Sequence, residues 1–253
     1  MLIGPYRTLL KRRTAYSAVA VRFNGDRLER GANLTGIAAS KVGIVSCWIN
    51  MKAGDGAQYH AIFEETNNGE KFHFYRWGDG NNRIQIRGKN AAGTNVLLIE
   101  SSATFTTSSG WQHLLASWDL ATGVGQIYVN DVSSLLAGST LTNDNVAYTT
   151  VVTDWSIGMR TSGSLYGLDA DIADLYVNFA AHLDLSNSTN RRKFITAGLK
   201  PVDLGADGST PTGTAPIVFQ KNALASWHTN LGSGGGFTVA AGALAAGASS
   251  PSS

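Results

Sequence analysis

The chain has 253 residues, of which 15% are charged, 43% are hydrophobic and 29 are glycine. A chain of this length buries a large core, and β-sandwiches of this size commonly fold as one domain. The formal net charge is only +2, so the overall field gives no reason to expect binding to nucleic acid or to an acidic substrate. Few charges together with many glycines is typical of short strands joined by polar turns, and it predicts an all-β protein.

Cysteine usage and hydropathy narrow the class further. Cys47 is the only cysteine, so no disulfide forms within the chain, and we expect its thiol to be buried. The absence of disulfides disfavours the class of small secreted modules that disulfides stabilise. The apolar stretch at residues 15–21 is short and runs into Arg22, which makes a poor signal peptide. No run of about 18 apolar residues occurs, so no membrane-spanning helix is predicted. These features favour a protein that is made and assembled in the cytoplasm.

The first 17 residues are predicted to form an N-terminal basic arm. Pro5 can open a short helix, but Leu9 and Leu10 are its only strong apolar residues, so we expect the arm to need a partner to be ordered. Contact with nucleic acid is the weaker interpretation, because the basic run at 11–13 has no interleaved aromatic residue. Contact with a neighbouring subunit is favoured, and the candidate residues are Arg7, Lys11, Arg12 and Arg13.

Strand patterns begin at Ala18 and recur along the chain. Residues 42–51 (VGIVSCWINM) form the strongest of them, β-branched and aromatic with clean alternation. Shorter strands, separated by glycine- and asparagine-rich turns, are expected at residues 61–64, 71–76, 83–87 and 96–101. Strand signals at this spacing, with almost no helical period, predict an antiparallel sandwich or jelly roll.

Residues 111–131 (WQHLLASWDLATGVGQIYVND) are the most informative segment. Leu114 and Trp118 lie on one face of an alternating strand, the alternation resumes after a glycine-containing loop, and Asn130-Asp131 suits a tight reversal. The segment resembles the signature hairpin of laminin-G-like jelly-roll domains, which belong to the concanavalin A-like group. In that group a Trp-x-His-aliphatic strand is followed by a loop and by an aliphatic-Tyr-Val strand that ends in a turn.

The second half of the chain resembles the same family. Its late strands carry an aliphatic-glycine pair, then a glycine with acidic residues, then an aliphatic-tyrosine strand that leads into a short helix. The matching residues are Ile157-Gly158, Gly167, Asp171, Asp174, Leu175 and Tyr176. Ser186 is expected to cap a helix that runs to about residue 196. The resemblance covers residues 18–198 and implies an antiparallel jelly-roll β-sandwich with one short helix, in a domain at 18–200.

Residues 201–253 form a C-terminal extension outside the family pattern. Glycine, alanine, serine and threonine dominate it, a composition typical of a flexible linker. Its few large apolar residues are separated by stretches of small and polar residues, and we expect them to hold the extension against neighbouring subunits. These candidate subunit contacts are Phe219, Trp227 and Phe237.

No catalytic arrangement is evident in the sequence. Some relatives with this fold hydrolyse glucans with paired carboxylates that project from one strand into the same groove. Glu64 and Glu65 are neighbours and face opposite sides of a strand, while Asp169 and Asp171 share a face that Asp174 does not. Neither group makes a good acid and nucleophile pair, so the sequence predicts a protein that is not an enzyme.

Calcium is the one cofactor that the resemblance suggests, because relatives often hold it with loop carboxylates and carbonyls. Asp79 is one candidate ligand, and Asp169 with Asp171 is another. The alternative is turn chemistry at Asp79 and strand-end hydrogen bonding at the other two residues. The five histidines have no spacing that suits a transition metal.

Glycan binding needs an exposed aromatic ring for the apolar face of a sugar and polar groups for its hydroxyls. Trp48, Trp118 and Trp155 fall in strand patterns and are expected in the core. Trp77 instead adjoins the polar turn GDGNN, and the alternative is that it closes one end of the sandwich. The candidate glycan-binding residues are Trp77, Tyr75, Arg76, Asp79, Asn81 and Asn82.

The leading hypothesis is a non-enzymatic structural subunit of a phage virion, in the tail, a fibre or the capsid decoration. A disulfide-free lectin-like sandwich with a small-residue extension resembles such proteins, which are assembled in the host cytoplasm and located in the virion. Its expected partners are other copies of itself, other virion proteins and cell-surface glycans. The alternative is a free carbohydrate-binding lectin, with or without calcium, and a glycoside hydrolase is the weakest of the three hypotheses.

Overall fold

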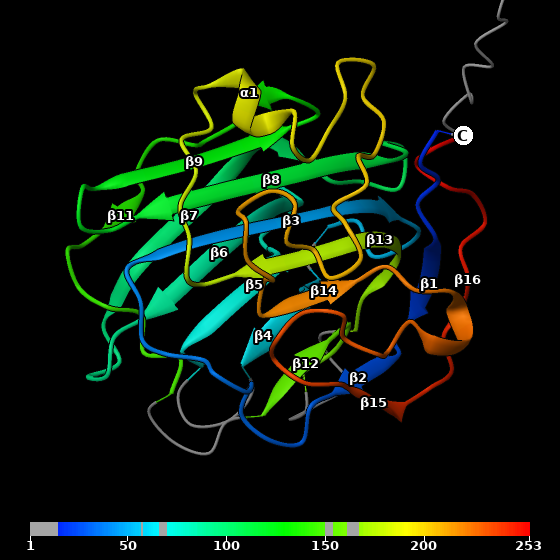
Figure 1. The fold of residues 1–253 in the computed structure, drawn as a ribbon, viewed down its shortest axis with the longest axis horizontal. Helices are drawn as coiled ribbons and strands as arrows, with labels where there is room; N and C mark the ends of the chain where they lie inside the picture. The colour runs from blue at the N-terminus through cyan, green and yellow to red at the C-terminus, as the bar shows by residue number, and fades with distance from the viewer. Residues whose placement is uncertain (1–14, 57, 66–69, 150–153, 161–166) are drawn as a thin grey trace, which may run out of the picture.

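The computed structural model describes residues 15–56, 58–65, 70–149, 154–160 and 167–253. They form two eight-stranded sheets whose neighbouring strands pair antiparallel. Figure 1 shows the two sheets packed face to face, and residues of both sheets meet in one hydrophobic core. The predicted all-β antiparallel sandwich is therefore confirmed.

The two sheets are named A and B here. Sheet A runs in the spatial order β10 (Val132–Ser133), β9 (Val124–Val129), β8 (Gln112–Asp119), β3 (Val42–Met51), β13 (Asp169–Asn178), β1 (Ala20–Asn24) and β16 (Ala245–Ala246), and β14 (Val218–Gln220) also pairs with β13. Sheet B runs in the order β11 (Thr140–Leu141), β7 (Asn95–Thr104), β6 (Arg83–Lys89), β5 (Phe72–Arg76), β4 (His60–Glu65), β12 (Trp155–Ile157), β2 (Arg27–Glu29) and β15 (Thr238–Ala241). Outside the sheets lie α1 (Ser188–Arg191) and the 3₁₀ helix η2 (Leu224–Ser226).

The hairpin predicted at residues 111–131 is the β8–β9 pair. Leu114 is paired with Val129, and the strands run in register to the loop that joins them. Asn130 and Asp131 have φ values of 48° and 66°, the left-handed conformation that asparagine and aspartate tolerate better than most residues. The tight reversal expected there is confirmed.

Stacked aromatic rings fill the space between the sheets. The rings of Tyr148 and Phe179 stack with centroids 4.0 Å apart, and those of Phe63 and Trp155 stack at 5.1 Å. Trp118 is fully buried in the same core. Aromatic side chains bury large areas and prefer such offset or edge-on geometries, so this cluster contributes much of the hydrophobic stabilisation.

The predicted burial of Trp48 and of Cys47 is also confirmed. Trp48 lies in a separate cluster on the other face of sheet A and is 3% exposed. Cys47 is fully buried, and burial raises the pKa of its thiol well above the ordinary value. The thiol is therefore a packing group in this structure.

A layer of loop residues covers the outer face of sheet A. Leu185, Phe194 and Leu204 pack there against residues of β3, β8 and β13 and against Phe219 of β14. The helix in this layer differs from the predicted one, because it spans only Ser188–Arg191 and its N-cap is Asn187 rather than Ser186. The Asn187 side chain accepts a hydrogen bond from the Thr189 backbone N–H at 2.9 Å. None of the helices in the described part of the chain is long and apolar enough to span a membrane.

The C-terminal extension is built into the sandwich. Its strands β14 and β16 join sheet A, and β15 joins sheet B. Phe219 and Trp227 are fully buried and Phe237 is 3% exposed, so the expected subunit contacts are instead packed inside their own chain. The composition is typical of a linker, but these few large apolar side chains pack into hydrophobic clusters of the same chain.

Of the predicted basic arm, the structure describes only the last residues, 15–17. Arg7, Lys11, Arg12 and Arg13 lie outside the described residues. Tyr16, next to the start of the described chain, donates a hydrogen bond from its hydroxyl to the Asp174 carboxylate at 2.7 Å. This contact places the end of the arm against β13.

Candidate functional site

A pocket opens on the outer face of sheet B, over strands β4, β5 and β6. Alternation along β5 creates it, because Phe72 and Phe74 point into the core and His73 and Tyr75 therefore point outward. Its cavity volume is about 190 Å³. Most of the described residues that line it belong either to an aromatic wall or to a charged floor.

The aromatic wall consists of Tyr59, Tyr75 and Trp77. The rings of Tyr59 and Trp77 meet edge to face with their centroids 4.7 Å apart. The rings of Tyr75 and Trp77 are tilted by 39° with centroids 5.5 Å apart. The Tyr75 hydroxyl donates to Gln85 Oε1, which fixes that ring, and Trp77 remains half-buried. Such a wall offers flat apolar surface of the kind that packs against the C–H face of a sugar.

Ion pairs connect the charged residues of the floor. Glu70 contacts two guanidinium groups, with Oε1 2.5 Å from Arg160 Nη1 and Oε2 3.2 Å from Arg87 Nη2. Glu64 Oε1 lies 3.4 Å from Arg160 Nε, and Glu64 Oε2 lies 3.1 Å from His73 Nδ1. Glu64 and His73 are register partners on β4 and β5, so the sheet itself sets this last contact.

Burial and neighbouring charges set the protonation of the floor. Burial opposes the charge of Glu70, but the positive charges of His73 when it is protonated, of Arg160 and of Arg87 outweigh it and lower the pKa of that carboxyl. Burial lowers the pKa of His73, and the hydrogen bond to Glu64 does not offset this effect. At pH 7 the floor therefore holds an ionised Glu70 beside a neutral imidazole. The buried His73 Nε2 has no hydrogen-bond partner among the described residues and lies 3.6 Å from Glu70 Oε2.

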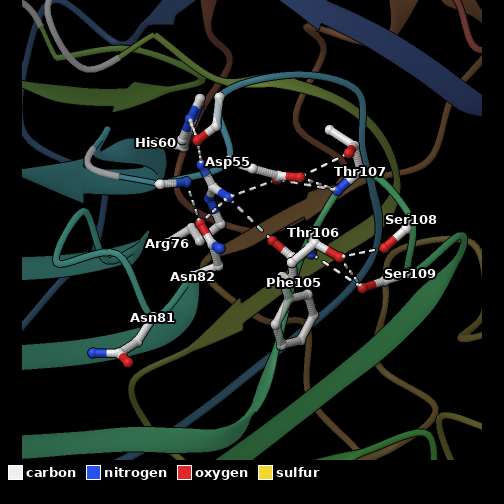
Figure 2. A network of polar contacts seen from close by, with 12 residues as sticks. Asp55, His60, Arg76, Asn81, Asn82, Phe105, Thr106, Thr107, Ser108 and Ser109 are labelled. Carbon is white, nitrogen blue, oxygen red and sulfur yellow. Dashed lines mark hydrogen bonds and ion pairs between the residues drawn. The ribbon is translucent and has the colours of Figure 1, made fainter.

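Arg76 does not reach the pocket, because it points to the opposite side of β5. Figure 2 shows its guanidinium among polar groups of neighbouring loops. Nη1 donates to Asn82 Oδ1 at 2.8 Å and to the Phe105 carbonyl at 3.2 Å, and it pairs with Asp55 at 3.3 Å. Nη2 donates to the Gly54 carbonyl. The side chain is fully buried, so it ties these loops together instead of facing a ligand.

The polar turn that follows Trp77 also lies outside the pocket. Asn81 donates its backbone and side-chain N–H groups to the Asp79 carboxylate at 2.9 and 2.7 Å, and both residues are exposed. The Asn82 side chain accepts a hydrogen bond from the Gly56 backbone at 2.9 Å and from Arg76. Of the predicted glycan-binding residues, the structure thus brings Tyr75 and Trp77 together in the pocket.

Two of the carboxylates predicted to hold calcium, Asp169 and Asp171, lie beside basic groups. Asp169 pairs with Arg22, and Asp171 lies 3.2 Å from Lys52 Nζ and 3.7 Å from Arg22 Nη1. No group of three or more histidine, cysteine, aspartate or glutamate residues arranged to hold a metal occurs among the described residues. Calcium binding stays a prediction, and the neighbouring positive charges oppose it electrostatically at Asp169 and Asp171.

A comparison with known families matches the part of the chain that carries the pocket. Residues 38–180, more than half of the sequence, match the family described as the concanavalin A-like lectin/glucanases superfamily. The chain belongs to this superfamily. The resemblance predicted from the β8–β9 hairpin is therefore confirmed. No protein with a curated description matches the sequence.

Solved structures show a likeness in fold. A candidate carbohydrate-binding protein from Bacteroides ovatus is 12% identical with a TM-score of 0.62, and the match covers 93% of this chain and 62% of that one. A heptameric SAP-like pentraxin from Limulus polyphemus is 14% identical with a TM-score of 0.48, covering 68% of this chain and 81% of that one. The binding domain of botulinum neurotoxin serotype D is 14% identical with a TM-score of 0.46, covering 70% and 43%. At these identities the likeness concerns the fold alone.

Part of the pocket in this concanavalin A-like protein could be predicted from the sequence. Counting back by two from Trp77 through Tyr75 gives His73 on the same face of the strand. Tyr59 and Arg160 come from other segments, and no local pattern places them beside that strand. These two residues are brought in by the sheet order, in which β4 pairs with both β5 and β12.

Proposed function

We propose that this chain is a carbohydrate-binding domain without catalytic activity, and that it holds a glycan in the pocket on sheet B. The observation that carries the proposal is the juxtaposition of an aromatic wall with a charged floor that contains a buried, unpartnered His73 Nε2. A sugar combines a C–H face with hydroxyl groups, and these two surfaces match the wall and the floor. Membership of a superfamily of lectins and glucanases supports the proposal. The Bacteroides ovatus protein, described as a candidate for carbohydrate binding, supports it through the shared fold.

Each part of the pocket has a separate role in this proposal. Trp77 packs against the apolar face of the sugar ring, and the buried Tyr75 ring supports Trp77. The glutamates accept hydrogen bonds from hydroxyls, and the arginines donate hydrogen bonds to ring and hydroxyl oxygens. Because the ion pairs already fix these side chains, little conformational entropy is lost when a ligand binds.

The charge state of Glu70 supports a role without catalysis. Glycoside hydrolysis needs a protonated carboxylic acid, usually with a raised pKa, together with a second carboxylate. The pKa of Glu70 is instead lowered, and two guanidinium groups contact it. A carboxylate held ionised in this way does not donate a proton at neutral pH, which supports binding rather than hydrolysis.

The proposal predicts that Trp77→Ala weakens glycan binding by about tenfold or more, because loss of an aromatic anchor costs on the order of 2 kcal/mol. The measurement is a glycan-array screen of the wild-type protein, followed by calorimetric titration of the best ligand into both proteins with and without a calcium chelator. Trp111→Ala is the matched control, since Trp111 is also half-buried but lies near the start of β8, outside the pocket. Equal affinities of wild type and Trp77→Ala would remove the proposed site.

A structural role in a phage virion is a second candidate, and the extension supports it. Strand β15 lies at the end of sheet B, and its first three residues are exposed and uncharged. Edge strands of this kind offer unpaired backbone groups to another chain. Light scattering on the purified protein tests this role, which requires a multimer and is contradicted by a monomer at every concentration measured.

A further inference from the structure

We infer that the pocket selects neutral glycans over acidic ones, an inference that rests on the proposed carbohydrate-binding function. Among the described residues of the floor, the carboxylates of Glu64 and Glu70 face the guanidinium groups of Arg87 and Arg160. Their formal charges cancel, and the imidazole of His73 adds none while it is neutral. A ligand with a carboxylate or a sulfate therefore finds no unmatched positive charge in this part of the pocket.

The two arginines already have anionic partners from the protein. Arg160 contacts Glu70 at 2.5 Å and Glu64 at 3.4 Å, and Arg87 contacts Glu70 at 3.2 Å. Guanidinium groups bind carboxylates and sulfates through charge-assisted hydrogen bonds, and here those bonds are made within the site. An acidic ligand therefore competes with Glu70 for the N–H donors of both arginines.

His73 adds a hydrogen-bond acceptor to the floor. Its Nδ1 lies 3.1 Å from Glu64 Oε2, an oxygen that only accepts, so we assign the ring proton to Nδ1. In that tautomer Nε2 is an acceptor, and it lies 3.6 Å from Glu70 Oε2, which is also an acceptor. Two acceptors side by side suit the O–H donors of a sugar.

The same acceptor pair repels an anion. A hydroxyl that donates to His73 Nε2 satisfies a polar atom that is otherwise buried without a partner, a gain that a carboxylate or sulfate oxygen does not provide. Like charges placed together at a binding site weaken association strongly. The floor therefore combines attraction for neutral hydroxyls with repulsion of acidic groups.

A glycan array with matched members tests the inference. Each neutral glycan is printed beside the same glycan extended with sialic acid and beside its sulfated form. The wild-type protein is expected to bind the neutral members at least about tenfold more tightly than their acidic counterparts. Equal or tighter binding of the acidic members, lost in Trp77→Ala, would overturn the inference and leave the carbohydrate-binding function standing. Binding to no glycan would overturn both.

Glu70→Gln gives a sharper test because it releases both arginines from their main carboxylate partner. The variant is expected to shift the ratio of acidic to neutral binding by about tenfold or more toward the acidic glycans. Glu100→Gln is the matched control, since Glu100 pairs with Arg83 at 3.5 Å, outside the pocket, and makes the same change in net charge. An unchanged ratio in a folded Glu70→Gln protein would contradict the inference.

Arg87→Gln keeps the test decisive if Glu70→Gln does not fold. This change removes one positive charge from the floor and leaves the two glutamates with Arg160. The ratio of neutral to acidic binding is then expected to rise above that of the wild type. An unchanged or lower ratio would show that the charge balance of the floor does not set the selectivity and would overturn the inference.

Discussion

His73 is the residue on which the chemistry of the pocket depends most. Its side chain is almost completely buried, and the groups that face it are Glu64, Glu70 and, at longer range, Arg87. Because burial lowers its pKa from the ordinary value of 6.5, the ring is neutral at pH 7 and Nε2 is free to accept a hydrogen bond.

This assignment predicts that glycan affinity is flat above pH 6.5 and falls at lower pH. Protonation places a hydrogen on Nε2, which then points toward Glu70 and no longer accepts from a sugar hydroxyl. Glu70 stays ionised over this range because its pKa is lowered, so the loss is assigned to His73. Titration calorimetry from pH 8 to 5 measures it. His73→Gln should bind more weakly but without this pH dependence, and an affinity that rises on acidification would contradict the assignment.

Neighbouring residues on one strand show how far sequence predicts the site. Tyr75 and Trp77 were expected to bind a glycan and do line the pocket, whereas Arg76 between them is fully buried and bonded to loop residues. Sequence proximity to an aromatic residue suggested all three, but alternation places adjacent residues on opposite faces. Strict use of the two-residue period includes His73 and excludes Arg76.

At the scale of elements, the aromatic wall depends on the close approach of two loops. Gly78 follows Trp77, and a Cβ atom added there would lie 2.8 Å from backbone atoms of Gln58 and Tyr59 and from Tyr59 Cδ2. Such a distance is shorter than real contacts, so any larger residue forces the loops apart. Glycine at this position is what allows Tyr59 to pack against Trp77.

Gly78→Ala is therefore expected to weaken glycan binding by about tenfold, since the Tyr59–Trp77 contact opens. Gly236→Ala is the matched control, because no atom lies within 4 Å of its added Cβ. Calorimetric titration of both variants measures the effect, and thermal unfolding confirms that each is folded. If Gly78→Ala binds as tightly as Gly236→Ala, the wall does not depend on this approach.

Local patterns predicted the elements whose contacts are close in sequence. The β8–β9 hairpin and strand β3 have a clear two-residue period, and both lie where expected. The helix expected from Ser186 to about residue 196 spans only Ser188–Arg191. Phe194 and Ile195, which follow this helix, are buried. Packing of these two side chains on sheet A outweighs the continuation of the helix.

At the scale of the whole molecule, the C-terminal extension completes both sheets. Strand β15 covers the edge of β2 and β16 covers the edge of β1, so the extension protects strands near the other end of the chain. Composition predicted a linker here because small residues dominate, and the few large apolar residues decide the outcome. The rings of Trp227 and Phe23 meet edge-on at 5.6 Å, a contact that no local pattern reveals.

Trp227→Ala is expected to lower the free energy of unfolding by about 3–5 kcal/mol, because it removes a fully buried ring from the core. Val239→Ala on β15 is the control, and a change within about 0.5 kcal/mol is expected because Val239 is 46% exposed. Denaturant unfolding of both variants measures the difference. Equal stabilities would mean that the extension is not part of the folded unit.

The measurement that tests the central claim most directly is a crystal structure of the protein with the best neutral glycan from the array. The account predicts a sugar ring packed on Trp77 in the pocket of sheet B, with one hydroxyl within hydrogen-bond distance of His73 Nε2. A glycan bound elsewhere, for example at the exposed turn of Asp79 and Asn81, with the pocket unchanged, would contradict it.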